Sequence, residues 1–267
     1  MNEIISNGKE VIRIEAEAIA DLKNSINEDF VNTVETIFTS KGRVVLTGMG
    51  KSGLIARKIV ATLNSTGTAA IYLHPTDALH GDLGMVRSED VVILISKSGE
   101  TEEISNLLPM LKRMNVKLIS MCGNKESKLA RECDLFLNIA VKEEACPYDL
   151  APTASTTATL ALGDALAVSL LKKRNFTAKD FAFLHPGGSL GKRLSLKIKE
   201  VMITGDRIPR VNKGTSIKDV IIEITSKRLG TTCVLDETGK LAGIITDGDL
   251  RRLLEITLDI TGLKASD

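Results

Sequence analysis

Two short stretches of glycine and hydroxyl residues have the composition of an anion site. The first, Gly48 to Gly53, reads GMGKSG, and the second, Ser96 to Thr101, reads SKSGET. Each follows an apolar run and precedes a segment with helical spacing. A helix N-terminus carries about half a positive charge and unpaired N–H donors, which suit a phosphate group. An N-cap followed by a turn would explain either stretch alone, but two in one sheet favour a shared anion site.

Side chains that could transfer protons lie near these stretches. Glu144 ends an apolar run and precedes a loop, and Glu103 falls in the first turn after the second stretch, where complementing the helix dipole is its simplest role. His80 and His185 lie in loops rich in glycine and proline, which favours a site over a core position. Spacing alone leaves open whether Glu144 is solvated or catalytic.

We expect neither a metal ion nor a dinucleotide cofactor. His74 and His80 are close in sequence, but no further residue has the spacing of a ligand. The glycines of the first stretch spell G-x-G-x-x-G, yet residues 60–73 contain none of the acidic residues that a ribose contact needs about 20 residues further on. The prediction is therefore a reaction without a cofactor.

Composition and charge indicate a globular protein that does not bind nucleic acid. The chain has 267 residues, of which 43% are hydrophobic and 26% charged, with a net charge of +1. Its basic residues are scattered, which argues against nucleic-acid and anionic-membrane partners. The 4 cysteines form no CxxC pair and suit a reducing compartment. Because we find no signal peptide and no apolar run of about 18 residues, we expect a cytoplasmic protein.

Strand-like and helical segments alternate through the first part of the chain. After an opening helix at 8–26, the predicted strands are 43–47, 69–73, 91–95, 117–121 and 135–139, and the helices are 51–63, 101–114, 126–133 and 155–173. Short, wholly apolar strands between helices predict a parallel sheet covered on both faces, which is a doubly wound α/β sandwich. Ligands of such sheets bind at the carboxyl ends of the strands, where both glycine stretches lie.

A different unit is predicted in the last part of the chain. Strands are expected at 208–211, 231–235 and 241–246, and helices at 216–228 and 247–256. The residues Asp236 to Gly239 between the last two strands signal a hairpin. We therefore predict two domains, 1–195 and 196–267.

Five motifs resemble, in order, the sugar isomerase (SIS) domain of the D-arabinose 5-phosphate isomerases. They are GMGKSG, HGDLGM, SxSGET, APTxSTTATLALGDALA and HPGGxLG. Residues 201–255 resemble a CBS motif, so the resemblance runs from Gly8 to about Asp259. It implies an SIS sandwich with a C-terminal partial CBS module, and a tetrameric aldose–ketose isomerase. Such an enzyme supplies the precursor of 3-deoxy-D-manno-octulosonate (Kdo) for lipopolysaccharide or capsule.

The resemblance also implies roles for individual residues. The substrate phosphate would be bound by Ser52, Ser96, Ser98 and Thr101. The active site would further contain Lys51, His80, Glu103, Glu144 and His185. Among these, Glu144 is our first choice for the base, with a pKa moved toward neutrality. His185 would move a proton between the oxygens or assist ring opening, Lys51 would stabilise the enediolate, and His80 would reach a neighbouring subunit.

The CBS motif implies a nucleotide or nucleotide-sugar regulator. Thr246 and Asp249 keep the T-x-x-D pattern that contacts ribose and phosphate in paired CBS motifs. The chain carries one such motif and ends at Asp267, from which we expect either a shortened form or a natural short protein.

Two other functions stay open at this point. One is a phosphosugar isomerase that acts on a heptose or hexose phosphate. The other is a non-catalytic sugar-phosphate sensor, because SIS domains also occur in transcription regulators. A regulator would need a DNA-binding domain, whereas the N-terminal segment reads as one amphipathic helix without a helix-turn-helix pattern.

Overall fold

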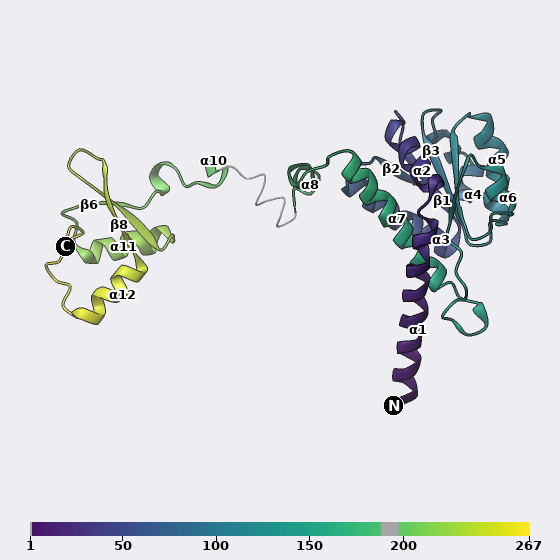
Figure 1. Cartoon of the computed structure of the whole chain (residues 1–267). Helices are drawn as coiled ribbons and strands as arrows, with labels where there is room; N and C mark the ends of the chain where they lie inside the picture. The colour runs from purple at the N-terminus through teal and green to yellow at the C-terminus, as the bar shows by residue number, and fades with distance from the viewer. Residues whose placement is uncertain (1, 188–197) are drawn as a thin grey trace. The chain divides into compact units, whose positions relative to one another are not determined.

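The computed structural model describes residues 2–187 and 198–267. The chain divides into two compact units, Met1–Ser195 and Leu196–Asp267, which Figure 1 shows in purple to green and in green to yellow. The predicted domain boundary at Ser195 lies outside the described residues.

Unit 1 contains the five strands of the predicted sheet. Its elements are α1 (Asn2–Asp21), η1 (Leu22–Ser25), α2 (Glu28–Thr39), β1 (Val44–Gly48), α3 (Gly50–Ser65), β2 (Ala70–Leu73), α4 (Pro75–Leu79), η2 (Asp82–Met85), β3 (Val91–Ser96), α5 (Glu102–Arg113), β4 (Lys117–Cys122), α6 (Lys128–Glu132), β5 (Leu135–Asn138), η3 (Pro147–Asp149), α7 (Ala154–Lys173) and α8 (Ala178–Leu184).

The strands pair in the order β2-β1-β3-β4-β5, and every pairing is parallel. The predicted doubly wound sheet is therefore confirmed. Because β2 and β3 flank β1, the direction of winding reverses between β1 and β3. Such a switch point is where open α/β sheets bind their ligands.

Alternate residues of each strand pack on opposite faces of the sheet. Leu46 and Ile93 belong to a core that α2, α3 and α7 complete, whereas Val45 and Leu94 face a second core formed mainly with α5. Every residue of β1 and β3 is buried. Two covered faces explain why these strands are mainly apolar and show no alternation with polar residues.

Three helices of unit 1 were not predicted from the sequence, namely α2, α4 and α8. For α2 the signal was present. The side chain of Asn27 caps the helix by accepting hydrogen bonds from the amides of Asp29 and Phe30 at 3.0 and 3.3 Å. Phe30, Val34 and Ile37 follow at helical spacing and are buried.

Helix α7 is apolar because it is a core helix. By length and composition it is the one helix of the described residues that could cross a membrane, and 50% of its apolar window is buried inside unit 1. Leu162, Leu166 and Leu170 line the core beneath the sheet. The helix is buried on one side, where it packs against α1 and α3.

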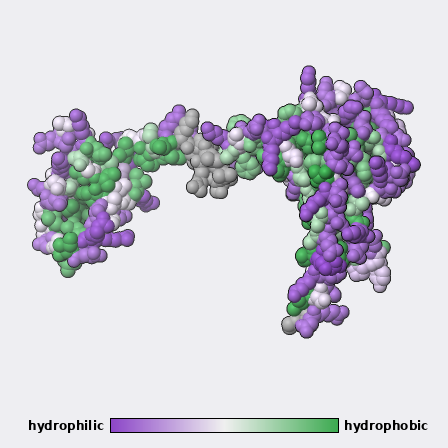
Figure 2. Space-filling model, viewed as in Figure 1, coloured by the Kyte–Doolittle hydropathy of each residue, from purple (hydrophilic) through white to green (hydrophobic). Residues whose placement is uncertain are grey.

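Unit 2 has a three-stranded sheet in the order β6-β7-β8. Its elements are α10 (Ile198–Val201), η4 (Gly205–Arg207), β6 (Arg210–Asn212), α11 (Ile217–Lys227), β7 (Thr231–Leu235), β8 (Leu241–Thr246) and α12 (Asp247–Ile256). The predicted hairpin is confirmed, since β7 and β8 pair antiparallel. The face of unit 2 seen in Figure 2 carries hydrophobic side chains, and Leu241, Ile244 and Ile256 are exposed.

We predict that unit 1 folds without unit 2. Both hydrophobic clusters of unit 1 consist of residues between Leu22 and Leu170, so removing unit 2 takes nothing from them. A chain ending at Lys199 should keep the helical circular dichroism of unit 1 and a cooperative thermal transition. If the shortened chain is monodisperse but has lost that transition, unit 1 depends on unit 2 for its stability.

Candidate active site

The two glycine stretches lie side by side at the carboxyl edge of the sheet. They follow the neighbouring strands β1 and β3, whose ends pair through Gly48 and Ile95. The first stretch turns sharply into α3, with Gly50 at a φ of +53°. A Cβ on Gly53 would lie 2.5 Å from the Gly48 carbonyl oxygen, so this turn needs glycine at position 53. The two loops therefore lie on the same edge of the sheet, whereas the shared anion site there stays a prediction.

The second loop is held in shape by its own hydroxyl groups. Ser96 is buried; its Oγ lies 2.8 Å from Thr101 Oγ1 and accepts a hydrogen bond from the amide of Gly99 at 3.0 Å. Ser98 is exposed, and its Oγ accepts a hydrogen bond from the amide of Glu100 at 3.2 Å. Gly99 has a φ of +73°, and a Cβ there would collide with the Ser127 side chain. The loop is thus preformed around a position that only glycine fits.

The remaining predicted residues of the two loops lie in the first turns of α3 and α5. Lys51 is exposed and Ser52 is half-buried in the first turn of α3, whereas Thr101 is the half-buried N-cap of α5. Glu103 is half-buried in the first turn of α5, where its charge complements the helix dipole. Both helix starts therefore present backbone donors, together with a lysine and hydroxyl groups, on one edge of the sheet.

Glu144 is a buried carboxylate at the start of α7. Its side chain has no exposed surface, and its Oε2 accepts hydrogen bonds from the Thr153 amide at 2.8 Å, the Ser155 amide at 3.1 Å and the Thr153 hydroxyl at 3.2 Å. Its Oε1 pairs with Lys97 Nζ at 2.7 Å. Lys97 stands between Ser96 and Ser98, so this ion pair joins Glu144 to the second loop.

The pKa of Glu144 moves in the direction opposite to our expectation. Burial alone would raise the pKa, but the hydrogen bond with Lys97, followed by those from Ser155 and Thr153, lowers it from 4.5 to about 2. The expectation of a pKa near neutrality is therefore wrong for the protein without substrate. The physical reason is that Lys97 and the start of α7 stabilise the ionised carboxylate more than burial destabilises it.

The two predicted histidines lie outside this cluster of contacts. His80 is exposed at the end of α4. His185 is half-buried at the end of α8; its ring stacks on Phe181 at 3.9 Å between centroids, and its Nδ1 lies 2.8 Å from the Phe181 carbonyl oxygen. Within residues 2–187 and 198–267, no hydrogen bond or ion pair joins either histidine to Glu144. The same residues contain no group of three His, Cys, Asp or Glu side chains suited to a metal ion.

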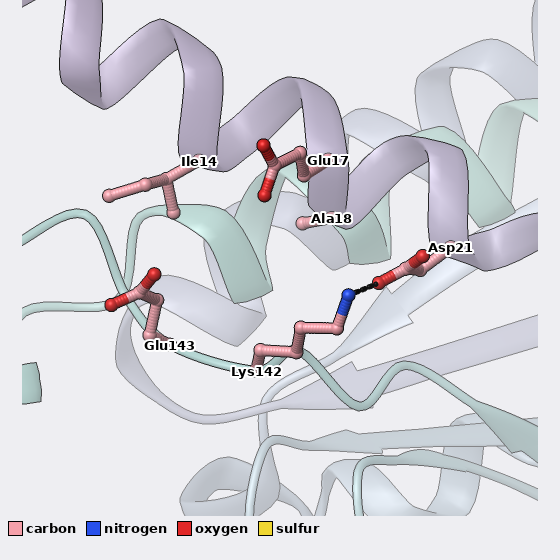
Figure 3. A pocket seen from close by; sticks show the side chains of 6 residues that line it. All are labelled: Ile14, Glu17, Ala18, Asp21, Lys142 and Glu143. Carbon is pink, nitrogen blue, oxygen red and sulfur yellow. Dashed lines mark ion pairs between the residues drawn. The ribbon is translucent and has the colours of Figure 1, made fainter.

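A small pocket is lined by Lys142 and Glu143, which precede Glu144 in the sequence, and it is too small for a sugar phosphate. Figure 3 shows it between α1 and the loop after β5, with Lys142 Nζ reaching Asp21 Oδ2 at 2.8 Å. Its volume of about 20 Å³ is that of a water site rather than a sugar phosphate. The pocket shows how α1 braces the loop that carries Glu144.

Sequence reasoning missed Lys97, Thr153 and Ser155, which hold Glu144. Lys97 occupies the variable position of SxSGET, and the other two belong to APTxSTTATLALGDALA, so the motifs included them without indicating a role. Only the fold shows that the loop after β3, the loop after β5 and the start of α7 converge.

In unit 2, Thr246 and Asp249 hydrogen-bond to each other. Thr246 is the N-cap of α12, and Asp249 Oδ2 accepts from the Thr246 amide and hydroxyl at 2.8 and 2.7 Å. These two residues form a capping box, which is a structural role that the T-x-x-D pattern fulfils without any ligand.

The lowered pKa predicts how Glu144 contributes to stability as the pH changes. A carboxylate with a depressed pKa in the folded state stabilises the protein above its unfolded pKa and loses that effect as the pH falls through the folded pKa. For a fall from 4.5 to about 2, the contribution is on the order of 3 kcal/mol. Glu144→Gln should therefore be less stable than wild type at pH 6, and the difference should shrink between pH 4.5 and pH 2 in urea denaturation. A difference that is constant with pH would contradict the assigned ion pair.

Family models match both units of the chain. Residues 37–169 match the SIS domain model, and residues 198–256 match the CBS domain model. The arabinose 5-phosphate isomerase KdsD of Escherichia coli K12 is 53% identical over 260 residues, which span 97% of this chain and 79% of that protein. The KdsD of Pseudomonas aeruginosa is 53% identical over 258 residues, with the same coverage.

A solved structure agrees with these relatives. The E. coli CFT073 protein c3406, solved in complex with arabinose 5-phosphate, superposes on this chain with a TM-score of 0.67 and 45% identity. The match covers 69% of this chain and 98% of that one. With an SIS domain over residues 37–169 and with relatives that are 53% identical over 97% of its length, the chain belongs to the family of the arabinose 5-phosphate isomerases.

Proposed function

We propose that the protein is an aldose–ketose isomerase that interconverts D-arabinose 5-phosphate and D-ribulose 5-phosphate. The observation that carries the proposal is the buried Glu144 carboxylate, paired at 2.7 Å with a lysine of a hydroxyl-rich loop at the switch point. This geometry supports a base beside a phosphate-binding loop. The family to which the chain belongs narrows the substrate to arabinose 5-phosphate.

The phosphate group would bind across the starts of α3 and α5. Ser52, Ser96, Ser98 and Thr101 are the proposed hydroxyl ligands, with backbone amides of both helix starts as further donors. The exposed Ser98 hydroxyl is the most accessible of the four. Anchoring the phosphate holds the distant carbonyl carbon and its neighbour in place for proton transfer.

The reaction would proceed through a cis-enediol. Glu144 would take the proton from C2 of the open-chain aldose, the C–H electron pair would form the C1=C2 bond, and the carbonyl oxygen O1 would gain a proton. Loss of the O2 proton then forms the C2 carbonyl, and C1 takes the proton from Glu144. His185 would move the proton between the oxygens or assist ring opening, and Lys51 would stabilise the enediolate charge. Glu103 and His80 are the remaining proposed active-site residues.

The proposed setting is Kdo biosynthesis in the cytoplasm, by a homotetramer. The exposed side chains of Ile5, Ile12 and Ile19 support an oligomer. They lie seven residues apart on α1, at exposures of 51%, 67% and 42%. A repeat of seven aligns them on one helix face, where a second copy would cover apolar surface.

Unit 2 is the proposed regulatory unit, with a nucleotide or nucleotide sugar as its ligand. Its family-model match to a CBS domain supports this assignment. Thr246 and Asp249 are the proposed contacts, and a ligand would have to compete with the hydrogen bonds that they make to each other.

Ser98→Ala should weaken substrate binding. Because the Ser98 hydroxyl is exposed in the proposed phosphate loop, its loss should raise KM for arabinose 5-phosphate by about fivefold or more while kcat changes less, as expected for a binding contact. Initial rates of ribulose 5-phosphate formation measure both constants. Unchanged KM and kcat in Ser98→Ala would show that the phosphate binds elsewhere. If the wild-type protein turns over a heptose or hexose phosphate faster than arabinose 5-phosphate, the proposed substrate is wrong.

Glu144→Gln should remove the base while keeping the size of the side chain. We expect kcat to fall by about 10² or more, with a smaller change in KM. Glu100→Gln is the matched control, because Glu100 Oε1 accepts a hydrogen bond from the Lys128 amide at 2.8 Å and belongs to the cap of α6. Deuterium incorporation from D₂O beside the carbonyl is the decisive measurement. Exchange at the wild-type rate in Glu144→Gln would assign the base to Glu103 or His80.

A further inference from the structure

Lys97 has contacts that no step of the proposed reaction uses. Its Nζ lies 2.7 Å from Glu144 Oε1 and 3.7 Å from Asp149 Oδ2. The Lys97 side chain is 42% exposed, whereas that of Glu144 is fully buried. Lys97 therefore lies between solvent and the buried carboxylate.

The two oxygens of Glu144 have different surroundings. Oε2 accepts hydrogen bonds from Thr153 and Ser155, which fix it to the start of α7. Oε1 faces Lys97 instead. Since Oε2 is saturated with backbone and hydroxyl donors, Oε1 is the oxygen that can accept a proton from substrate.

The main chain of Lys97 is held at the carboxyl edge of the sheet. Its carbonyl oxygen accepts a hydrogen bond from the Gly123 amide, at the end of β4, at 3.0 Å. Its neighbours Ser96 and Ser98 are proposed phosphate ligands. One residue thus connects the phosphate loop to the oxygen that takes the proton.

We propose that Lys97 is a positioning residue that holds Oε1 of Glu144 at a fixed place relative to the phosphate loop. The proposal rests on the proposed function of Glu144 as the base. Lys97 acts through Glu144 and need not touch the reacting carbons. Without it, the buried carboxylate would lose its cationic partner and could turn away from the substrate.

The charges around Glu144 predict the direction in which its pKa changes when Lys97 is removed. Lys97 is the cation facing the carboxylate, and Asp149 is the nearby anion, whose Oδ1 accepts from the Glu144 amide at 2.8 Å. Removing Lys97 takes away one group that stabilises the carboxylate. It leaves the hydrogen bonds from Thr153 and Ser155, which favour the carboxylate, together with burial and Asp149, which favour the protonated acid. The pKa of Glu144 must then rise from its value of about 2.

The test compares Lys97→Met with Lys97→Arg and with Lys58→Met. Lys58 is a matched control because its Nζ pairs with Asp164 at 2.6 Å and its side chain is 46% exposed, but the pair links α3 and α7 away from Glu144. Lys97→Arg keeps the cation and should retain most of the activity.

We expect Lys97→Met to lower kcat by about tenfold or more with a smaller change in KM, and to move the acid limb of kcat/KM upward by about one pH unit or more. Lys97→Arg and Lys58→Met should leave that limb in place. A wild-type pH profile and kcat in Lys97→Met would overturn the proposal.

A second readout separates this proposal from the proposed function. Titration of ¹³C-labelled glutamate carboxyls by NMR, assigned with Glu144→Gln, gives the pKa of Glu144 without any substrate. An upward shift of that pKa in Lys97→Met supports the pairing, whether or not wild type isomerises arabinose 5-phosphate. A wild-type protein without isomerase activity would contradict the proposed function but not the pairing. An unchanged pKa overturns the pairing whatever the activity.

Should Lys97→Met fail to fold, the double variant Lys97→Met/Glu144→Gln keeps the test valid. It leaves no buried charge without a partner, so it should show a cooperative melting transition even where Lys97→Met shows none, and a higher melting temperature where both variants fold. A double variant that is no more stable than Lys97→Met would contradict a direct Lys97–Glu144 interaction.

Discussion

The buried carboxylate of Glu144 joins three segments that the sheet delivers to one edge. Through Lys97 it holds the loop after β3, through its own backbone the loop after β5, and through Thr153 and Ser155 the start of α7. Burying a charge is costly unless it is paired and hydrogen-bonded, and removing one partner of such a pair costs more than the pair itself contributes. This requirement restricts the three segments to arrangements in which the partners of Glu144 stay in place.

Close packing beneath the site sets where these segments begin. The side chain of Ile59 on α3 fits against Gly163 of α7, where any Cβ would collide with it. Glycine there lets the two helices approach, and both pack against the same face of the sheet. The start of α3 then lies at the end of β1, next to the loop after β3, because parallel strands end at the same edge. The packing of α3 against α7 therefore also determines where the start of α3 lies in the site.

Much of the fold could be predicted from the chain because its strands are buried on both faces. The apolar runs at β1, β3 and β4 are typical of strands that are covered on both faces, and the turn at Asp236 to Gly239 predicts the hairpin of β7 and β8. The glycine stretches could likewise be placed at strand ends. Helix α8 was missed because it is short and has one buried residue, Ala182, although Thr177 and Asp180 form a capping box at its start. The partners of Glu144 were also out of reach, because Lys97 lies 47 positions before it in the sequence and only tertiary folding brings them together.

The low pKa of Glu144 limits what its pairing with Lys97 can do for catalysis. At neutral pH a carboxyl group with an ordinary pKa of 4.5 is already ionised almost completely, so a fall to about 2 adds almost no active base. It does make the carboxylate a weaker proton acceptor, which slows proton abstraction according to the Brønsted relation. The ion pair therefore serves to position the buried charge and to compensate it, at some cost in basicity. For Oε1 to take a proton from carbon, the ammonium group of Lys97 must shift away as the carboxylate loses its charge. The Lys97 side chain is 42% exposed, and its Nζ lies 3.7 Å from the Asp149 carboxylate. The ammonium group can therefore move toward solvent and Asp149.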